Sequence, residues 1–121
     1  MIHSEAINMI TITDEFMLQM LPTTRPYCIV ILRDGPNKDI EGRDSIVWEH
    51  GRRNFSLRAQ GVLAIVCPIK DESNIHGVGI FNAMVEEVKE IMEGDPAVRT
   101  GIFVYEIHET RSFPGDSLPG E

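Results

Sequence analysis

His50 is the residue of this sequence best suited to proton transfer. It shares one stripe of an expected helix with Ile46, Val47, Asn54 and Leu57, so its imidazole is expected to point inward, toward a sheet. Imidazole groups titrate near working pH and can therefore act as general acids or bases. A buried histidine held by a single hydrogen bond is the commoner arrangement, and the residues alone leave both interpretations open.

Two aspartates follow expected elements of secondary structure. Asp34 lies at the carboxyl end of a strand, where it could orient or charge-balance His50 as carboxylates do when they fix a histidine's tautomer. An aspartate that bonds its own backbone within a turn is the commoner case. Asp95 precedes a proline after a later helix, and this pattern is typical of the turn that ends a helix.

The motifs that bind cofactors or metals are missing from the sequence. It holds no phosphate loop, no GxGxxG after a strand and no GxSxG elbow. His76, Gly77 and Gly79 resemble a glycine-rich loop only superficially, because they lead into a strand. No two histidines pair at a metal-ligand spacing such as HExxH; the four are His3, His50, His76 and His108. We therefore expect neither a cofactor nor a metal.

Hydrophobic periodicity predicts the elements that position these groups. Short apolar runs rich in β-branched residues predict buried strands at 27–32, 62–66, 78–81 and 102–107. Between them, apolar positions spaced at 3.6 residues predict two helices. The order is strand, helix, strand, strand, helix, strand, which is the ferredoxin-like βαββαβ pattern of an α+β protein.

The ends of the two helices are marked by residues with known preferences there. Asp44 can cap the first helix, which stops at Gly61. Asn82 can cap the second helix, and Gly94 ends it.

We expect three segments along the chain. Residues 1–24 form an N-terminal extension with an extra helix, which Thr13 or the residue after it can cap and Pro22 must stop. Residues 25–112 form one α+β domain. Residues 113–121 are rich in turn-forming residues without periodicity and are expected to form an extended tail.

Composition and charge exclude several classes of partner. Nineteen acidic residues against eleven basic ones give a net charge of −8, which repels phosphate backbones and anionic membranes, so we expect no nucleic acid and no membrane partner. No apolar run approaches the roughly 20 residues needed to cross a bilayer. The N-terminus lacks the basic region of a signal peptide.

Cys28 and Cys67 lie in apolar runs without CxxC spacing, so both are expected to be buried and reduced, which predicts a cytoplasmic location.

The expected sheet has one face without helices. Because the strand at 27–32 is apolar at consecutive positions, both of its faces require burial. In a chain of 121 residues the expected cover is a second copy of the chain. This predicts a homodimer with the two sheets face to face.

Several short motifs, taken in order, resemble the YciI-like (YCII-related) family. They are YCIVILRDGPN from Tyr27, His50 within the first helix, GVLAIVCP from Gly61, VEEV from Val85, Asp95 with Pro96, and GIFVYEI from Gly101. The resemblance covers residues 25–112 and leaves the N-terminal extension outside it. The sequence departs from the family pattern in two places. Cys67 stands where the family has the glycine of Ala-Gly-Pro, and Met84 stands where a serine or aspartate caps the second helix.

The resemblance implies a dimeric α+β barrel with a cleft that holds a histidine and an aspartate. These match His50 and Asp34, with Asp95 as a further acid, and the three are the expected catalytic residues. The activity that it implies is elimination of HCl from 5-chloro-2-hydroxyhydroquinone to give 2-hydroxy-1,4-benzoquinone, a cofactor-free carbon–halide lyase reaction on a small aromatic substrate. Related barrels isomerise muconolactones, so a muconolactone-type isomerase is one alternative. A non-catalytic small-molecule binding protein is the other.

Overall fold

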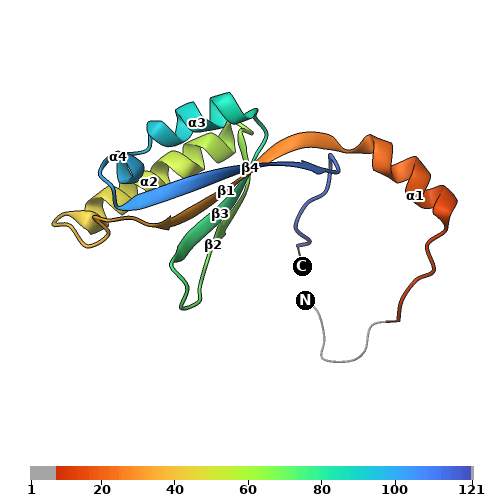
Figure 1. The fold of residues 1–121 in the computed structure, drawn as a ribbon, viewed down its shortest axis with the longest axis horizontal. Helices are drawn as coiled ribbons and strands as arrows, with labels where there is room; N and C mark the ends of the chain where they lie inside the picture. The colour runs from red at the N-terminus through yellow and green to blue at the C-terminus, as the bar shows by residue number, and fades with distance from the viewer. Residues whose placement is uncertain (1–7, 121) are drawn as a thin grey trace. The chain divides into compact units, whose positions relative to one another are not determined.

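The computed structural model describes residues 8–120 (Figure 1). The start of the expected N-terminal extension, on which the expectation about a signal peptide depends, lies outside the described residues. The chain divides into two units, of which one is Pro26–Ser112 and the other holds the residues on either side of it. All candidate functional residues lie in the unit Pro26–Ser112. The independence of 25–112 as a domain stays a prediction.

Four strands of the chain form one antiparallel sheet in the order β2-β3-β1-β4. Three helices, α2, α3 and α4, lie on the same face of this sheet (Figure 1). The elements are β1 (Arg25–Asp34), α2 (Arg43–Ala59), β2 (Leu63–Pro68), β3 (Ile75–Phe81), α3 (Val85–Glu93), α4 (Pro96–Arg99) and β4 (Phe103–Ser112). This is the expected ferredoxin-like order, with the four-residue helix α4 added before the last strand.

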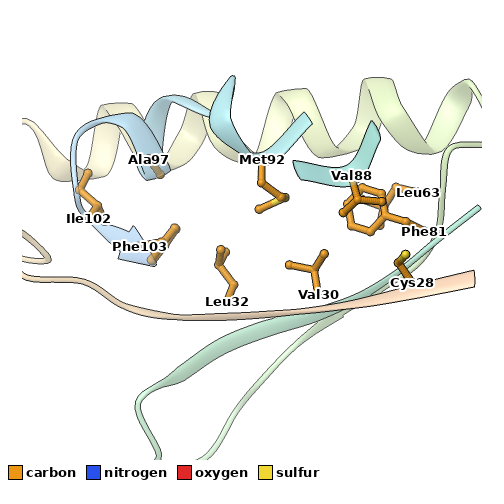
Figure 2. Packing of buried hydrophobic residues seen from close by; sticks show 10 residues of the cluster. All are labelled: Cys28, Val30, Leu32, Leu63, Phe81, Val88, Met92, Ala97, Ile102 and Phe103. Carbon is orange, nitrogen blue, oxygen red and sulfur yellow. The ribbon is translucent and has the colours of Figure 1, made fainter. Parts of the chain in front are cut away.

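The hydrophobic core lies between the sheet and the helices (Figure 2). Alternate residues of a strand point to the same face, and in β1 these are Cys28, Val30 and Leu32, which are all buried. The rest of the core comes from both strands and helices: Leu63, Phe81, Val88, Met92, Ala97, Ile102 and Phe103. Of the two cysteines, Cys28 is buried as expected, but Cys67 is exposed. The expectation for Cys67 was wrong because it lies near the end of β2, where the residues from Val66 onward are exposed.

Helix α2 begins one residue before its predicted cap. Gly42, in the left-handed conformation at φ 82°, takes the N-cap position, and its carbonyl accepts a hydrogen bond from the backbone N–H of Ile46. Asp44 lies instead within the first turn, where a carboxylate favours the helix through the helix dipole. At the other end Gly61, at φ 76°, follows the last turn, which confirms the predicted stop.

Helix α3 begins three residues after its predicted cap. Asn82 lies directly after β3, and its backbone N–H donates to the carbonyl of Val62 at 2.8 Å, one hydrogen bond beyond the β2–β3 pairing. Met84 therefore occupies the N-cap position, with no side-chain hydrogen bond to the helix. The C-cap is Gly94, as the sequence predicts.

Strand β3 carries one more residue than its neighbour β1 over the same length. Leu32 pairs with Gly77, but the next residue, Arg33, pairs with Ile75, so His76 is left without a partner in this ladder. A bulge of this kind locally re-aims a side chain. The His76 ring lies against the buried ring of Phe103, with their centroids 4.1 Å apart. The bulge thus brings an imidazole to the face of the sheet that the helices cover.

The second unit contains helix α1 (Asp14–Met20) and the 3₁₀ turn η1 (Leu21–Thr23). The hydroxyl of Thr13 caps α1 by accepting from the backbone N–H of Phe16 at 3.1 Å, as predicted. Pro22 lies in η1, where the α-helix has ended. Among residues 8–120 no helix is long and apolar enough to cross a bilayer.

Candidate functional site

His50 is buried on the face of α2 that packs toward the sheet, with 6% of its surface exposed. Its Nδ1 lies 2.6 Å from Oδ2 of Asp95, and its Nε2 lies 3.3 Å from the side-chain amide of Asn54. An ionised carboxylate only accepts hydrogen bonds, so we assign the proton of the neutral ring to Nδ1. The Asn54 amide can then donate to the lone pair of Nε2. This tautomer makes Nε2 the nitrogen that can accept a proton.

Asp95 is held rigidly by the turn between α3 and α4. Its Oδ1 accepts from the backbone N–H of Ala97 at 2.8 Å, so it caps the short helix α4, and only 1% of the residue is exposed. Burial by itself would raise the pKa of this carboxyl. The hydrogen bond and charge of His50, with the backbone N–H groups of Ala97 and Val98, outweigh that effect and hold the pKa of Asp95 below its ordinary value. Asp95 is thus an ionised, fixed partner for the imidazole.

A guanidinium group lies beside the buried pair. Nη1 of Arg53 is 3.9 Å from Oδ2 of Asp95 and has no hydrogen-bond partner among residues 8–120. A Cβ added at Gly94 would lie 2.8 Å from Nη2 of the same arginine, so glycine leaves room there for this side chain. The guanidinium thus lies within ion-pair distance of the buried carboxylate without forming a hydrogen bond to it.

Asp34, the aspartate expected to orient His50, does not take that place. The carboxylate that accepts the hydrogen bond from Nδ1 of His50 is that of Asp95, which lies 45 positions after His50 in the chain. Asp34 ends β1, and its backbone N–H donates to the carbonyl of Asn74 at 2.9 Å. The negative charge of Asp34 nevertheless affects the site, because it acts to raise the pKa of His76, whereas burial and the nearby positive charges lower it.

His76 is the residue of the site that the sequence did not reveal. Its ring centroid is 6.1 Å from that of His50, and Phe103 lies against both rings. Burial is the main cause that lowers the pKa of His76, and the charges of His50, Arg43 and Lys70 act in the same direction. The ring is therefore neutral at pH 7 and able to accept a proton or donate a hydrogen bond. The one signal in the sequence was a lone histidine before the two glycines of an apolar strand.

A cavity of about 580 Å³ opens between α2 and the sheet, and both histidines line it. The other polar side chains in its wall are those of Asn54, Arg58 and Cys67. Most of the remaining lining is apolar and comes from β1, β2, β3 and α2. Such a cavity, apolar with a few converging polar groups, suits a small organic molecule.

Two glycines of β3 form part of the cavity wall, and each lies close to a neighbouring strand. A Cβ at Gly79 would lie 3.0 Å from the side chain of Leu63, and one at Gly77 would lie 3.3 Å from the carbonyl oxygen of Cys67. Side chains at these positions would therefore crowd the wall between β2 and β3. The glycines that resembled a phosphate loop in the sequence have instead a packing role beside the cavity.

The arrangement is suited to moving protons on a bound small molecule. A fixed carboxylate orients one imidazole, whose other nitrogen is a proton acceptor, and a second imidazole lies nearby in the same cavity. In the part of the chain from 8 to 120, no three His, Cys, Asp or Glu side chains are grouped so that they could hold a metal ion.

Comparison with known proteins relates the chain to one fold. No family model and no curated protein sequence matches it. Among solved structures, 5-chloro-2-hydroxyhydroquinone dehydrochlorinase (TftG) from Burkholderia phenoliruptrix AC1100, in complex with 2,5-dihydroxybenzoquinone, matches with a TM-score of 0.53. The sequences are 20% identical, and the match covers 68% of this chain and 90% of that one. Membership of the YciI-like family stays a prediction, and what the comparison establishes is that the chain shares the fold of this dehydrochlorinase.

Proposed function

We propose that this protein is a cofactor-free dehydrochlorinase, a carbon–halide lyase that acts on 5-chloro-2-hydroxyhydroquinone and gives 2-hydroxy-1,4-benzoquinone and chloride. The observation that carries the proposal is that His50, which lines an apolar cavity, is hydrogen-bonded to the buried carboxylate of Asp95. The proposal is also supported by the fold that the chain shares with TftG, which is a dehydrochlorinase. The substrate is taken from that likeness and from the sequence resemblance.

The reaction needs proton transfers and no outside electron acceptor. Nε2 of His50 accepts a hydroxyl proton, and electron density from that oxygen lets the chlorine-bearing carbon take up a proton. A second hydroxyl then loses its proton and becomes a carbonyl, while chloride leaves with the electrons of the C–Cl bond. Two hydroxyl protons depart, one proton returns to carbon, and the ring loses HCl overall. The quinone therefore forms without nicotinamide or flavin.

Each residue of the site has a separate task in this scheme. His50 is the general acid and base, and a positioned group of this kind contributes about 10²–10⁴-fold to the rate. Asp95 is the positioning residue, because it fixes the ring and its tautomer. Asp34 contributes through its charge on His76. A bound ring would displace water from the apolar walls, which would strengthen the interaction of these groups with a phenolate.

The test is chloride release from 5-chloro-2-hydroxyhydroquinone, measured without oxygen and with a reductant because hydroquinols oxidise unaided. Wild type, His50→Ala and a sample without enzyme are compared, with His108→Ala as the matched control, since His108 is an exposed histidine of β4 outside the cavity. We expect His50→Ala to lower turnover about 10²–10⁴-fold and the control to leave it unchanged. No chloride above background from wild type would refute the proposal and favour a muconolactone-type isomerase or a binding protein. Full turnover by His50→Ala would refute the role of His50.

We also propose that the protein is a homodimer. The face of the sheet opposite the helices carries Tyr27, Ile29 and Ile31, which alternate with the buried residues of β1, and Val104 of β4 is 45% exposed. A second copy placed face to face would bury these side chains. Light scattering is expected to give twice the 13.6 kDa of one chain. Ile29→Glu should then yield monomers, and a monomeric wild type at micromolar concentration would contradict the proposal.

A further inference from the structure

The wall of the cavity carries permanent charge of one sign. Although the chain has nineteen acidic residues and eleven basic ones, no aspartate or glutamate among the described residues lines this cavity, whereas Arg58 does. Asp95 contacts His50 but is not part of the wall. A cavity with a positively charged wall, in a chain whose net charge is −8, is suited to a negatively charged ligand.

The guanidinium of Arg58 has no acidic partner in the part of the chain that the structure describes. By contrast, Arg52 on the same helix pairs with Glu49 at 3.2 Å. Arg58 is exposed, so a dissolved ligand can reach it. A guanidinium stays charged and presents its N–H donors as a planar fork, which matches ionised oxygens. An incoming anion can therefore bind Arg58 without displacing an ion pair.

Arg58 lies on the same side of α2 as the candidate base. His50, Asn54 and Arg58 follow one another at intervals of four residues, which places them on one face of the helix, and all three line the cavity. Long side chains of a helix lean toward its N-terminus, which for Arg58 is the direction of Asn54. The helical wall of the cavity thus offers a proton acceptor, an amide and then a cation.

We propose that Arg58 binds an ionised oxygen of the substrate, so that the cavity prefers ring compounds that carry one negative charge to neutral rings of the same shape. This inference rests on the proposed function, because it takes the cavity as the substrate site. It adds a substrate-binding residue and a rule for the charge of the ligand.

A cation in this wall also suits the proposed chemistry. Transfer of a hydroxyl proton to His50 leaves a negative charge on the ring oxygen, and a guanidinium that is already in place stabilises that charge. His76 does not supply a positive charge, because burial lowers its pKa and keeps the ring neutral at pH 7. Arg58 is thus the group of the wall that favours an ionised oxygen through its charge.

The test compares binding of 4-nitrophenol with binding of 4-nitroanisole, in which a methyl group replaces the ionisable proton. At pH 8 most of the 4-nitrophenol is ionised, and calorimetric titration gives the affinity of each compound. Wild type is expected to bind the phenolate more tightly than its neutral analogue. Arg58→Gln should lower this ratio of affinities about fivefold, which is near the upper limit for an exposed ion pair. Arg58→Lys keeps the charge and should keep a preference for the phenolate.

Two controls separate binding at Arg58 from other effects. Arg52→Gln removes the same charge from an exposed position of α2 outside the cavity, so it should leave the ratio unchanged. The proton NMR signals of the imidazole rings locate the probe: those of His50 and His76 should shift when 4-nitrophenol is added, and that of His108, outside the cavity, should not. If circular dichroism shows that Arg58→Gln is not folded, Arg58→Met takes its place with the same expectation.

The inference would be overturned if wild type showed no preference for the phenolate, if Arg58→Gln left the ratio unchanged, or if Arg52→Gln lowered it equally. Binding of the probe without movement of the His50 and His76 signals would also overturn it. Chloride release does not enter this measurement. A protein that prefers the phenolate but releases no chloride would refute the proposed function and support the inference, whereas chloride release without that preference would do the reverse.

Discussion

Replacement of Asp95 by asparagine would test the orientation of the candidate base. The carboxylate accepts two hydrogen bonds, from Nδ1 of His50 at 2.6 Å and from the backbone N–H of Ala97 at 2.8 Å. An asparagine has one acceptor oxygen and one NH₂ group. If its oxygen keeps the Ala97 bond, its NH₂ faces Nδ1 of His50. The ring must then carry its proton on Nε2, and the nitrogen that reaches the cavity becomes a donor.

The structure predicts a much larger effect of Asp95→Asn on activity than on stability. The wrong tautomer removes the general base, which is worth about 10²–10⁴-fold in rate. A lost hydrogen bond to a charged group costs about 1.5–3 kcal/mol. Part of this cost is offset because the variant no longer buries a charge, and burial is the largest single influence on the pKa of Asp95. We therefore expect unfolding free energy to fall by no more than about 3 kcal/mol.

The assay combines chloride release with urea unfolding at pH 7. Because the pKa of Asp95 in the fold is below its ordinary 3.8, its stabilising effect is fully present above about pH 4 and is lost only as the pH falls through the lowered pKa. A measurement at pH 7 thus captures the whole difference. Asp44→Asn is the matched control, since the side chain of Asp44 is fully exposed. Turnover within threefold of wild type in a folded Asp95→Asn protein would refute the reasoning.

Three further predictions concern single residues of the fold. The pKa of His76 is lowered from its ordinary value of 6.5, mainly by burial, so the neutral ring stabilises the fold at pH values above 6.5, and this stabilisation is lost as the pH falls from 6.5 through the lowered pKa. The drop in melting temperature between pH 7 and pH 5.5 should therefore be smaller in His76→Gln than in wild type. An equal drop in the two proteins would contradict this. A Cβ at Gly35 would clash with the backbone carbonyl oxygen of Gly101. Gly35→Ala should therefore lower the urea midpoint by an amount that corresponds to a loss of about 3 kcal/mol in unfolding free energy. A loss below about 1 kcal/mol would show that the turn relaxes to accept the methyl group. Burial, followed by the hydrogen bond and charge of Glu93, raises the pKa of Tyr105 to about 12. Ultraviolet titration should therefore show one tyrosine that ionises near that pH, and this titration step should be missing in Tyr105→Phe. If the step remains in that variant, the assignment to Tyr105 is refuted.

The order of the elements was predictable because each signal for it is local. The apolar run of β1 and the glycines that end α2 and α3 act within a few residues of themselves. The cap of α3 was mispredicted because the backbone N–H of Asn82 bonds to the carbonyl of Val62, just beyond the β2–β3 pairing, and a long-range contact of this kind cannot be predicted from the neighbouring residues.

The candidate site was only partly predictable for the same reason. His50 could be found because its position on a helical stripe fixes its direction. Its partner could not be derived from spacing, because the turn that carries Asp95 reaches α2 only through the packing of α3 and α4. His76 depended on a bulge, since regular pairing would have sent its side chain to the opposite face of the sheet.

The hydrogen bond between His50 and Asp95 joins the first half of the domain to the second. The first β-α-β segment provides the imidazole, and the corner that precedes β4 provides the carboxylate. Closing a chain segment of this length costs conformational entropy, which is recovered only when the intervening strands and helix are packed. A partly folded chain therefore has no oriented base. The proton-transfer geometry arises as a cooperative property of the whole domain, in the same event that completes its core.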